Sequence, residues 1–176
     1  RNDLMVRTPA DLRQQFNLDV RVMTEAVGIN TAAKTVTLRD LQTEEETVER
    51  YDALVLSPGA APIRPAIPGG DLPEVYTLRS VPDMDAIVRA CHSATKRKAI
   101  VIGAGLIGLE MAENLLRRGF RVHQIERLDQ VLPLLDPEMS QSVQREMVAR
   151  GIDLHLNDSA ACIERRMDCG IDVTLK

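Results

Sequence analysis

The stretch "KAIVIGAGLIGLEMAENLLRRGFRVHQIE", residues Lys98–Glu126, decides the fold. It begins with branched apolar residues, passes through three glycines in the spacing GxGxxG, and continues into a segment with helical periodicity. A second apolar run, residues 120–125, ends in the carboxylate of Glu126. The order of strand, glycine turn, helix and strand predicts a parallel βαβ unit.

Each glycine has a separate physical task if this unit holds a pyrophosphate. After a buried strand, Gly103 permits the tight turn, Gly105 lets the backbone approach the ligand, and Gly108 lets the helix pack closely on the strand. The helix that follows offers unpaired N–H groups and the positive end of its dipole. A purely structural glycine turn remains the alternative. The predicted dinucleotide-binding residues of this loop are Gly103, Ala104, Gly105, Leu106, Ile107 and Gly108.

The acidic residue at the end of the second strand adds to this prediction. Glu126 lies 23 positions after Gly103, close to the ~20-residue interval expected for an acid that hydrogen-bonds an adenosine ribose. A carboxylate there favours NADH over NADPH, because it would repel a 2′-phosphate. Arg121 and Arg127 stand near enough in sequence to weaken this preference without reversing it. Glu126 and Arg127 are therefore predicted to bind the cofactor.

Length and composition bound the remaining possibilities. The chain has 176 residues, enough for one ordinary domain or two small ones, and 44% of them are hydrophobic. Its net charge of -4 disfavours a nucleic-acid partner or an anionic membrane surface. No apolar run approaches the ~20 residues of a bilayer span, and no signal peptide is recognisable. A cytoplasmic protein is expected.

The cysteines and the first residue give two further expectations. Cys91, Cys162 and Cys169 form neither a CxxC pair nor an even set, which argues against a secreted disulfide framework. We expect buried or half-buried structural thiols. The chain begins with Arg1 rather than Met and reads as the middle of a longer protein.

Upstream of the glycine unit the sequence predicts a helix and several strands. Residues Pro9–Phe16 have helical signals, and β-branched runs at 20–29, 34–40 and 46–52 predict an antiparallel meander. The run "ALVLS", residues 53–57, is continuously apolar, as in a strand buried on both faces of a parallel sheet.

A proline- and glycine-rich connection then precedes the second half of the chain. The stretch "SPGAAPIRPAIPGG", residues 57–70, predicts an extended segment with a domain boundary at about residue 68. Beyond it we expect an edge strand at 75–78 and a helix from Ser80 to about Ala94.

After the glycine unit the predicted elements are one helix and two strands. Asp136 caps a helix that Gly151 ends, and the two strands lie within residues 152–157 and 171–176.

Three segments in order, "LVLSPGAAPIRP", "VYTLRSVPDMDAI" and the glycine unit continued through "ERLDQVLPLLDPEM", resemble the FAD-dependent pyridine nucleotide-disulfide oxidoreductases. The resemblance is greatest to the branch of coenzyme A disulfide reductases, persulfide reductases and NADH oxidases. It implies an α/β fold, with a β-meander and part of an FAD-binding domain in residues 1–68. Residues 69–176 would form a Rossmann-like NAD-binding domain, incomplete at its end, in a homodimeric parent protein.

The resemblance also implies particular site residues. A family pattern at a strand exit falls on Ser57, Pro58, Gly59 and Ala60, which implies backbone contacts to FAD; a plain Pro-Gly turn is the alternative. Glu110 matches a helix glutamate that lies near the nicotinamide and flavin in relatives, and is the implied catalytic residue. By position alone it is an exposed helix carboxylate.

This chain also departs from the family pattern. Many relatives carry at Leu106 a tyrosine that gates the nicotinamide pocket, so gating by a ring is not implied here. None of the three cysteines falls at the family's redox position, so no catalytic thiol is assigned.

The function implied by the resemblance is that of an enzyme using FAD and NADH. Hydride would pass from NADH to the flavin, and electrons onward to a disulfide, a persulfide or oxygen, with coenzyme A disulfide reductase-like chemistry preferred. Two alternatives remain. The isolated chain could be a non-catalytic dinucleotide-binding module, or the protein could be an FAD-dependent reductase of a ferredoxin-type partner.

Overall fold

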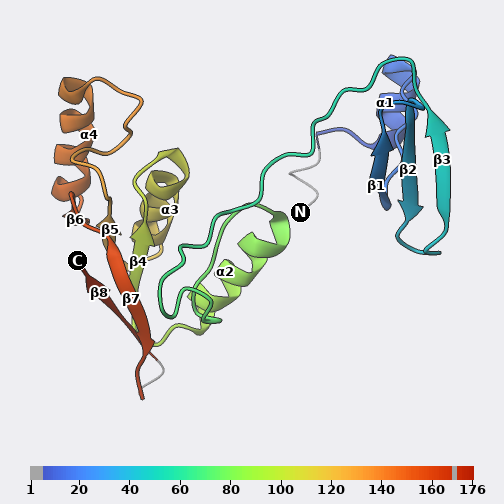
Figure 1. Cartoon of the computed structure of the whole chain (residues 1–176). Coiled ribbons are helices and arrows are strands. Elements are labelled where there is room, and N and C mark those ends of the chain that lie inside the picture. The colour runs from blue at the N-terminus through green and yellow to red at the C-terminus, as the bar shows by residue number, and fades with distance from the viewer. Residues whose placement is uncertain (1–5, 168–169) are drawn as a thin grey trace. The chain divides into compact units, whose positions relative to one another are not determined.

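The chain divides after Gly59 into two units in the computed structural model, which describes residues 6–167 and 170–176. Each unit has its own secondary structure, and the elements are labelled in Figure 1.

The first unit contains one helix and the expected antiparallel meander. Helix α1 (Pro9–Phe16) begins at Thr8, whose side chain caps it. Strands β1 (Thr24–Asn30), β2 (Thr35–Asp40) and β3 (Glu46–Arg50) pair in sequence order, as Figure 1 shows. The predicted meander is confirmed. None of the described residues of this unit is buried, so it contributes no closed core.

The second unit is built on a three-stranded parallel sheet with the order β4-β5-β6. Its strands are β4 (Lys98–Ile102), β5 (Arg121–Ile125) and β6 (Asp153–His155). Helix α3 (Leu106–Arg117) joins β4 to β5 and packs on both strands, and α4 (Pro137–Ala149) packs on β6. The expected α/β fold with a Rossmann-like βαβ unit is confirmed.

The core of this unit lies on the helix-covered face of the sheet. From α3, Ala112 and Leu115 are buried there, as the helical spacing predicts, and Leu116 is half-buried against them. On the outer face of α3, Glu113 and Arg117 form an ion pair at 2.7 Å. The buried cluster consists of Val101, Ala104, Ala112, Leu115, Phe120, Val122, Val131, Met147 and Ile152.

The remaining elements flank this sheet in the sequence. Helix α2 (Val81–Ser93) begins at Ser80, as predicted. Strand β8 (Ile171–Leu175) was also expected, but its antiparallel partner β7 (Ala160–Arg165) was not, since its alanines have low strand propensity. The N–H group of Ile163 in β7 donates to the carbonyl of Pro68 at 2.8 Å, which ties the proline-rich connection to this unit.

Two predicted strands are wrong. Residues 53–57 are unpaired, with Val55 86% and Leu56 66% exposed, because an apolar run becomes a strand only where neighbouring strands accept and donate its backbone hydrogen bonds. No strand in the described part of the chain lies beside it. Residues 75–78 also form no strand; there the guanidinium of Arg64 donates to the Val75 carbonyl at 3.0 Å.

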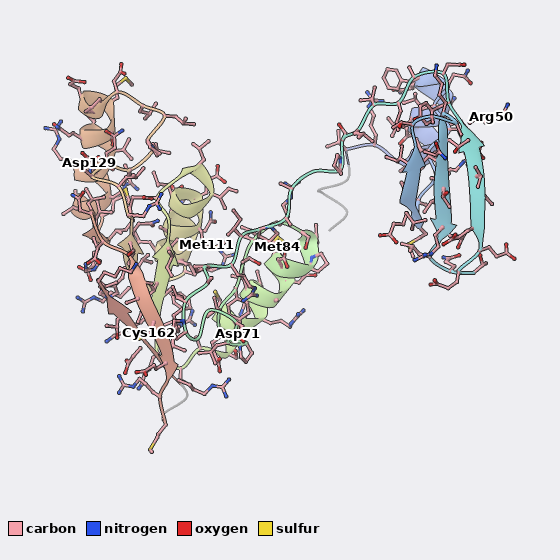
Figure 2. The ribbon with its side chains drawn as sticks, viewed as in Figure 1. Arg50, Asp71, Met84, Met111, Asp129 and Cys162 are labelled. Atoms are coloured by element: carbon pink, nitrogen blue, oxygen red, sulfur yellow. The ribbon has the colours of Figure 1, made fainter. Side chains whose placement is uncertain are left out.

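Both described cysteines fit the expectation of structural thiols. Cys91 and Cys162 are half-buried and unbridged, and Cys162 lies on β7 (Figure 2). Cys169 lies outside the described residues. Within residues 6–167 and 170–176, none of the helices combines the length and the apolar character needed to cross a bilayer.

The start of α2 generates a stability prediction. The Asp83 carboxylate accepts from the Ser80 N–H at 2.8 Å, the Ser80 hydroxyl accepts from the Asp83 N–H at 3.4 Å, and hydrogen bonds from Ser80 hold the pKa of Asp83 below its usual value. We expect Ser80→Ala to lower the free energy of unfolding by about 1 kcal/mol. Urea denaturation followed by circular dichroism measures this. The mid-helix control Ser142→Ala should change stability little, and equal effects would contradict the capping role.

Candidate dinucleotide-binding site

The turn between β4 and α3 requires glycine at two positions for different reasons. Gly103 has φ +97°, in the left-handed region that side chains disfavour, and its N–H donates to the Ile125 carbonyl at 2.8 Å. Gly108 is limited by packing, because a Cβ there would lie 2.0 Å from the Gly103 carbonyl oxygen. Helix α3 therefore approaches the turn more closely than any residue with a side chain would allow.

Gly105 is required by neither conformation nor packing. It stands at the N-cap of α3 with φ -76°, and a Cβ built on it would meet nothing within 4 Å. No side chain among the described residues caps the helix there, and the next residues, Leu106 and Ile107, are 66% and 63% exposed. The backbone at Gly105 can be approached closely from solvent. That is the property a pyrophosphate needs at a helix N-terminus.

The carboxylate of Glu126 faces this loop. Its Oε2 accepts from the N–H of the fully buried Ala104 at 2.6 Å, and its Oε1 accepts from the Leu128 N–H at 3.0 Å. A carboxylate offers roughly four acceptor positions, so each oxygen retains capacity for a sugar hydroxyl. Glu126 is half-buried and Arg127, next to it, is exposed.

Gln124 contacts the glycine turn, which the sequence did not lead us to expect. It is fully buried in β5, and its Nε2 donates to the Gly103 carbonyl. Its Oε1 is buried without a hydrogen-bond partner among the described residues. The run 120–125 was interpreted as an apolar strand, and the signal that could have identified this residue is the amide in the middle of it.

Glu110 lies on the exposed side of α3. It comes four residues after Leu106, so both residues occupy one face of the helix. The neighbouring Met111, labelled in Figure 2, packs instead against the core. The Glu110 side chain is exposed, and its backbone carbonyl accepts from the Asn114 amide at 2.8 Å.

The segment expected to contact FAD spans the division between the units. Ser57, Pro58 and Gly59 end the first unit, and Ala60 opens the second. All four are exposed, and Gly59 has φ +76°, as a tight turn requires. The Ala60 carbonyl accepts from the Arg79 guanidinium at 3.0 Å.

On the other face of the sheet, charged and imidazole groups from β5 and β6 meet. Arg121 pairs with Asp153 at 2.9 Å and holds the pKa of that carboxyl below its usual value. The rings of His123 and His155 stack with centroids 5.7 Å apart, and His123 Nε2 lies 3.6 Å from Asp153. Over the described ranges no cluster of histidine, cysteine, aspartate or glutamate could hold a metal ion.

The parallel sheet, the glycine turn and the helix that begins at it define a Rossmann-type α/β domain. Residues 3–176 match the family described as pyridine nucleotide-disulphide oxidoreductase, and the chain belongs to that family.

Curated proteins and solved structures of the same family are similar over most of the chain. A coenzyme A disulfide reductase of Staphylococcus haemolyticus (strain JCSC1435) is 35% identical over 164 residues, 93% of this chain and 37% of that protein. The structure of reduced Bacillus anthracis CoADR-RHD matches with TM-score 0.86 and 39% identity, over 99% of this chain and 32% of that one.

A third similar protein was solved with a nicotinamide cofactor. The water-forming NADH oxidase from Lactobacillus brevis, bound to NADH, matches with TM-score 0.87 and 29% identity, over 99% of this chain and 38% of that one. This chain thus spans between about a third and two fifths of the length of the proteins it matches.

The different demands on two glycines generate a paired prediction. Gly108→Ala places a methyl group against backbone atoms of Gly103, so we expect a loss of about 1–3 kcal/mol in the free energy of unfolding. Gly105→Ala meets no neighbour and should stay within about 1 kcal/mol of the unaltered chain. Urea denaturation of both variants checks this, and a greater loss for Gly105→Ala would refute the packing account.

Proposed function

We propose that the chain is the central part of an FAD- and NADH-dependent oxidoreductase, in which residues 69–176 bind NADH and residues 1–68 belong to the FAD-binding domain. The observation that carries the proposal is the glycine turn with the Glu126 carboxylate bonded to it at 2.6 Å. The similar NADH oxidase structure was solved with NADH bound, which supports the cofactor assignment.

The residues of the turn fit the parts of NADH in order. The open backbone at Gly105 and the N-terminus of α3 stabilise the pyrophosphate through N–H groups and the helix dipole. The remaining acceptor positions of Glu126 take the hydroxyls of the adenosine ribose, and the same negative charge disfavours a 2′-phosphate. The exposed side chains of Leu106 and Ile107 offer apolar contact beside the loop, and the exposed Arg127, next to Glu126 in the sequence, is assigned to the adenosine end.

On the flavin side, the proposal assigns Ser57, Pro58, Gly59 and Ala60 to backbone contacts with FAD. The positive φ of Gly59 turns the chain sharply after an extended, exposed run, so the backbone is open to a ligand. When bound, FAD accepts a hydride from the nicotinamide and passes electrons onward. The task of this chain's residues is to hold the two rings in a reactive arrangement.

For the electron acceptor we favour coenzyme A disulfide-like chemistry, with persulfide and oxygen as the other candidates. The support is the 35% identity to a coenzyme A disulfide reductase and the likeness to CoADR-RHD. The proposal places the whole protein in the cytoplasm as a homodimer. Cys91 and Cys162 are half-buried and no role in the reaction is proposed for either.

Two other functions give different results in simple measurements. If the chain alone is a non-catalytic dinucleotide-binding module, it will bind NADH while its purified form shows no flavin absorbance. A reductase of a ferredoxin-type partner would, in the whole protein, transfer electrons to that partner and leave coenzyme A disulfide unreduced.

Nicotinamide fluorescence during titration with NADH and NADPH tests the cofactor site directly. We expect the chain to bind NADH more tightly than NADPH. Glu126→Ala should weaken NADH binding by about tenfold to a hundredfold, because a charge-assisted hydrogen bond is lost. Glu126→Gln keeps an acceptor for the Ala104 N–H but removes the negative charge. The preference for NADH over NADPH, measured as the ratio of their affinities, should therefore decrease.

The control for these variants is Glu164→Gln, a charge change on an exposed residue of β7. It should leave both affinities unchanged. If the unaltered chain binds neither nucleotide, or if Glu126→Ala binds NADH as the unaltered chain does, the proposed site is wrong.

Glu110 is proposed to act near the nicotinamide and flavin rather than at the pyrophosphate. In the whole protein we expect Glu110→Gln to keep the NADH dissociation constant within about twofold but to slow flavin reduction roughly tenfold or more. Stopped-flow absorbance of the flavin measures the rate. The matched control is Glu113→Gln on the same helix, and an unchanged rate in Glu110→Gln would leave this residue as an ordinary surface carboxylate.

A further inference from the structure

The peptide group between Gly103 and Ala104 is held at both ends by the same strand. Its carbonyl oxygen, on Gly103, accepts from Nε2 of Gln124, and its N–H, on Ala104, donates to Oε2 of Glu126 at 2.6 Å. The two ends of a trans peptide point in opposite directions, so these bonds together fix the orientation of the peptide plane. Gln124 and Glu126 are two residues apart on and just after β5, with side chains directed to the same side of the strand.

The orientation of this peptide matters for an anion at the turn. If the peptide rotated, the negative end of its dipole would turn away from the core and toward the ligand side of the loop. Gly103 has the conformational freedom to permit such a rotation, since it lacks a Cβ. A bond to its carbonyl from the core side is what opposes the rotation.

The surroundings of Gln124 indicate that its amide is present for this bond. Its partners across the sheet are Val101 on β4 and Leu154 on β6, both apolar, and a Cβ on Gly108 of α3 would lie 3.2 Å from its Nε2. Its Oε1 is buried and unsatisfied among the described residues, which costs stability. A buried polar side chain that lowers the stability of the core is expected at a functional site.

We infer that Gln124 is a positioning residue for the dinucleotide site, which acts by holding the Gly103 carbonyl toward the core so that the loop presents its N–H groups to the pyrophosphate. The inference rests on the proposed function and extends it to a residue that does not touch the cofactor. Gln124 works together with Glu126, because the two side chains hold opposite ends of one peptide.

The primary test compares NADH affinity with thermal stability. Gln124→Met keeps the shape of the side chain but cannot donate to the Gly103 carbonyl; it also removes the unsatisfied Oε1. We expect about tenfold weaker NADH binding by nicotinamide fluorescence and a melting temperature close to that of the unaltered chain. The matched control Gln141→Met, at an exposed position of α4, should change neither quantity.

A second variant separates hydrogen bonding from shape. In Gln124→Glu the neutral carboxyl can donate to the Gly103 carbonyl, whereas the ionised form repels it. Burial among Val101, Leu154 and Gly108, with the charge of Glu126 nearby, favours the neutral form into the neutral pH range. NADH affinity of this variant should therefore match the unaltered chain near about pH 6 and fall toward about pH 9, while Gln124→Met stays weak throughout.

A double-mutant comparison tests whether both residues act on one peptide. The second change is Glu126→Ala, which removes the acceptor of the Ala104 N–H. The loss of NADH affinity in the double variant Gln124→Met/Glu126→Ala should be smaller than the product of the two single losses, because both single changes release the same peptide. If the two single losses of NADH affinity multiply fully in the double variant, the proposal that both side chains hold one peptide is contradicted.

The outcomes separate this inference from the proposed function. If the unaltered chain binds NADH and Gln124→Met binds it equally well, the positioning role is wrong while the site stands. Gln124 is merely structural if two results appear together. The melting temperature of Gln124→Met falls along with its NADH affinity, and Gln124→Glu does not recover NADH affinity at low pH. If the unaltered chain binds no NADH, both proposals are overturned.

Discussion

The contact between α3 and the end of β4 is the constraint on which the second unit depends. Because Gly108 has no side chain, helix α3 approaches within van der Waals distance of the Gly103 carbonyl. The turn is also bonded to β5, since the Gly103 N–H donates to the Ile125 carbonyl. The hydrogen bonds from Gln124 and to Glu126 complete this hold. A closely packed and immobilised turn exposes the helix N-terminus in one defined orientation, which a binding site for an anion requires.

The two units differ greatly in burial. The parallel strands of the second unit are covered by α3 and α4, and side chains such as Val122 and Ala112 lie out of water entirely. The first unit has one short helix and three strands, and none of its described residues is buried. Apolar side chains in an element are buried only when another layer covers them, whatever the local sequence favours.

Much of the second unit was predictable, because its signals are local. The cap at Ser80, the glycine spacing, the inner face of α3 at Ala112 and Leu115, and the acid at the end of β5 all follow from residues close together in the chain. The strand expected at residues 53–57 failed because pairing needs partners distant in sequence. Gln124 was missed because its role depends on a carbonyl 21 residues earlier.

The sequence by itself determined where the βαβ unit begins and ends and which residues form its turn, since periodicity, caps and glycine conformations are properties of short segments. Only the tertiary structure decided which side chains fix this turn, Gln124 and Glu126, and how closely each of its glycines is packed. Gly103 is required by its backbone angle, Gly108 by its neighbour, and Gly105 by nothing within the described protein. The physical reason is that close approach and hydrogen-bond partnership are distances between strands and helices, and those exist only after the chain has packed.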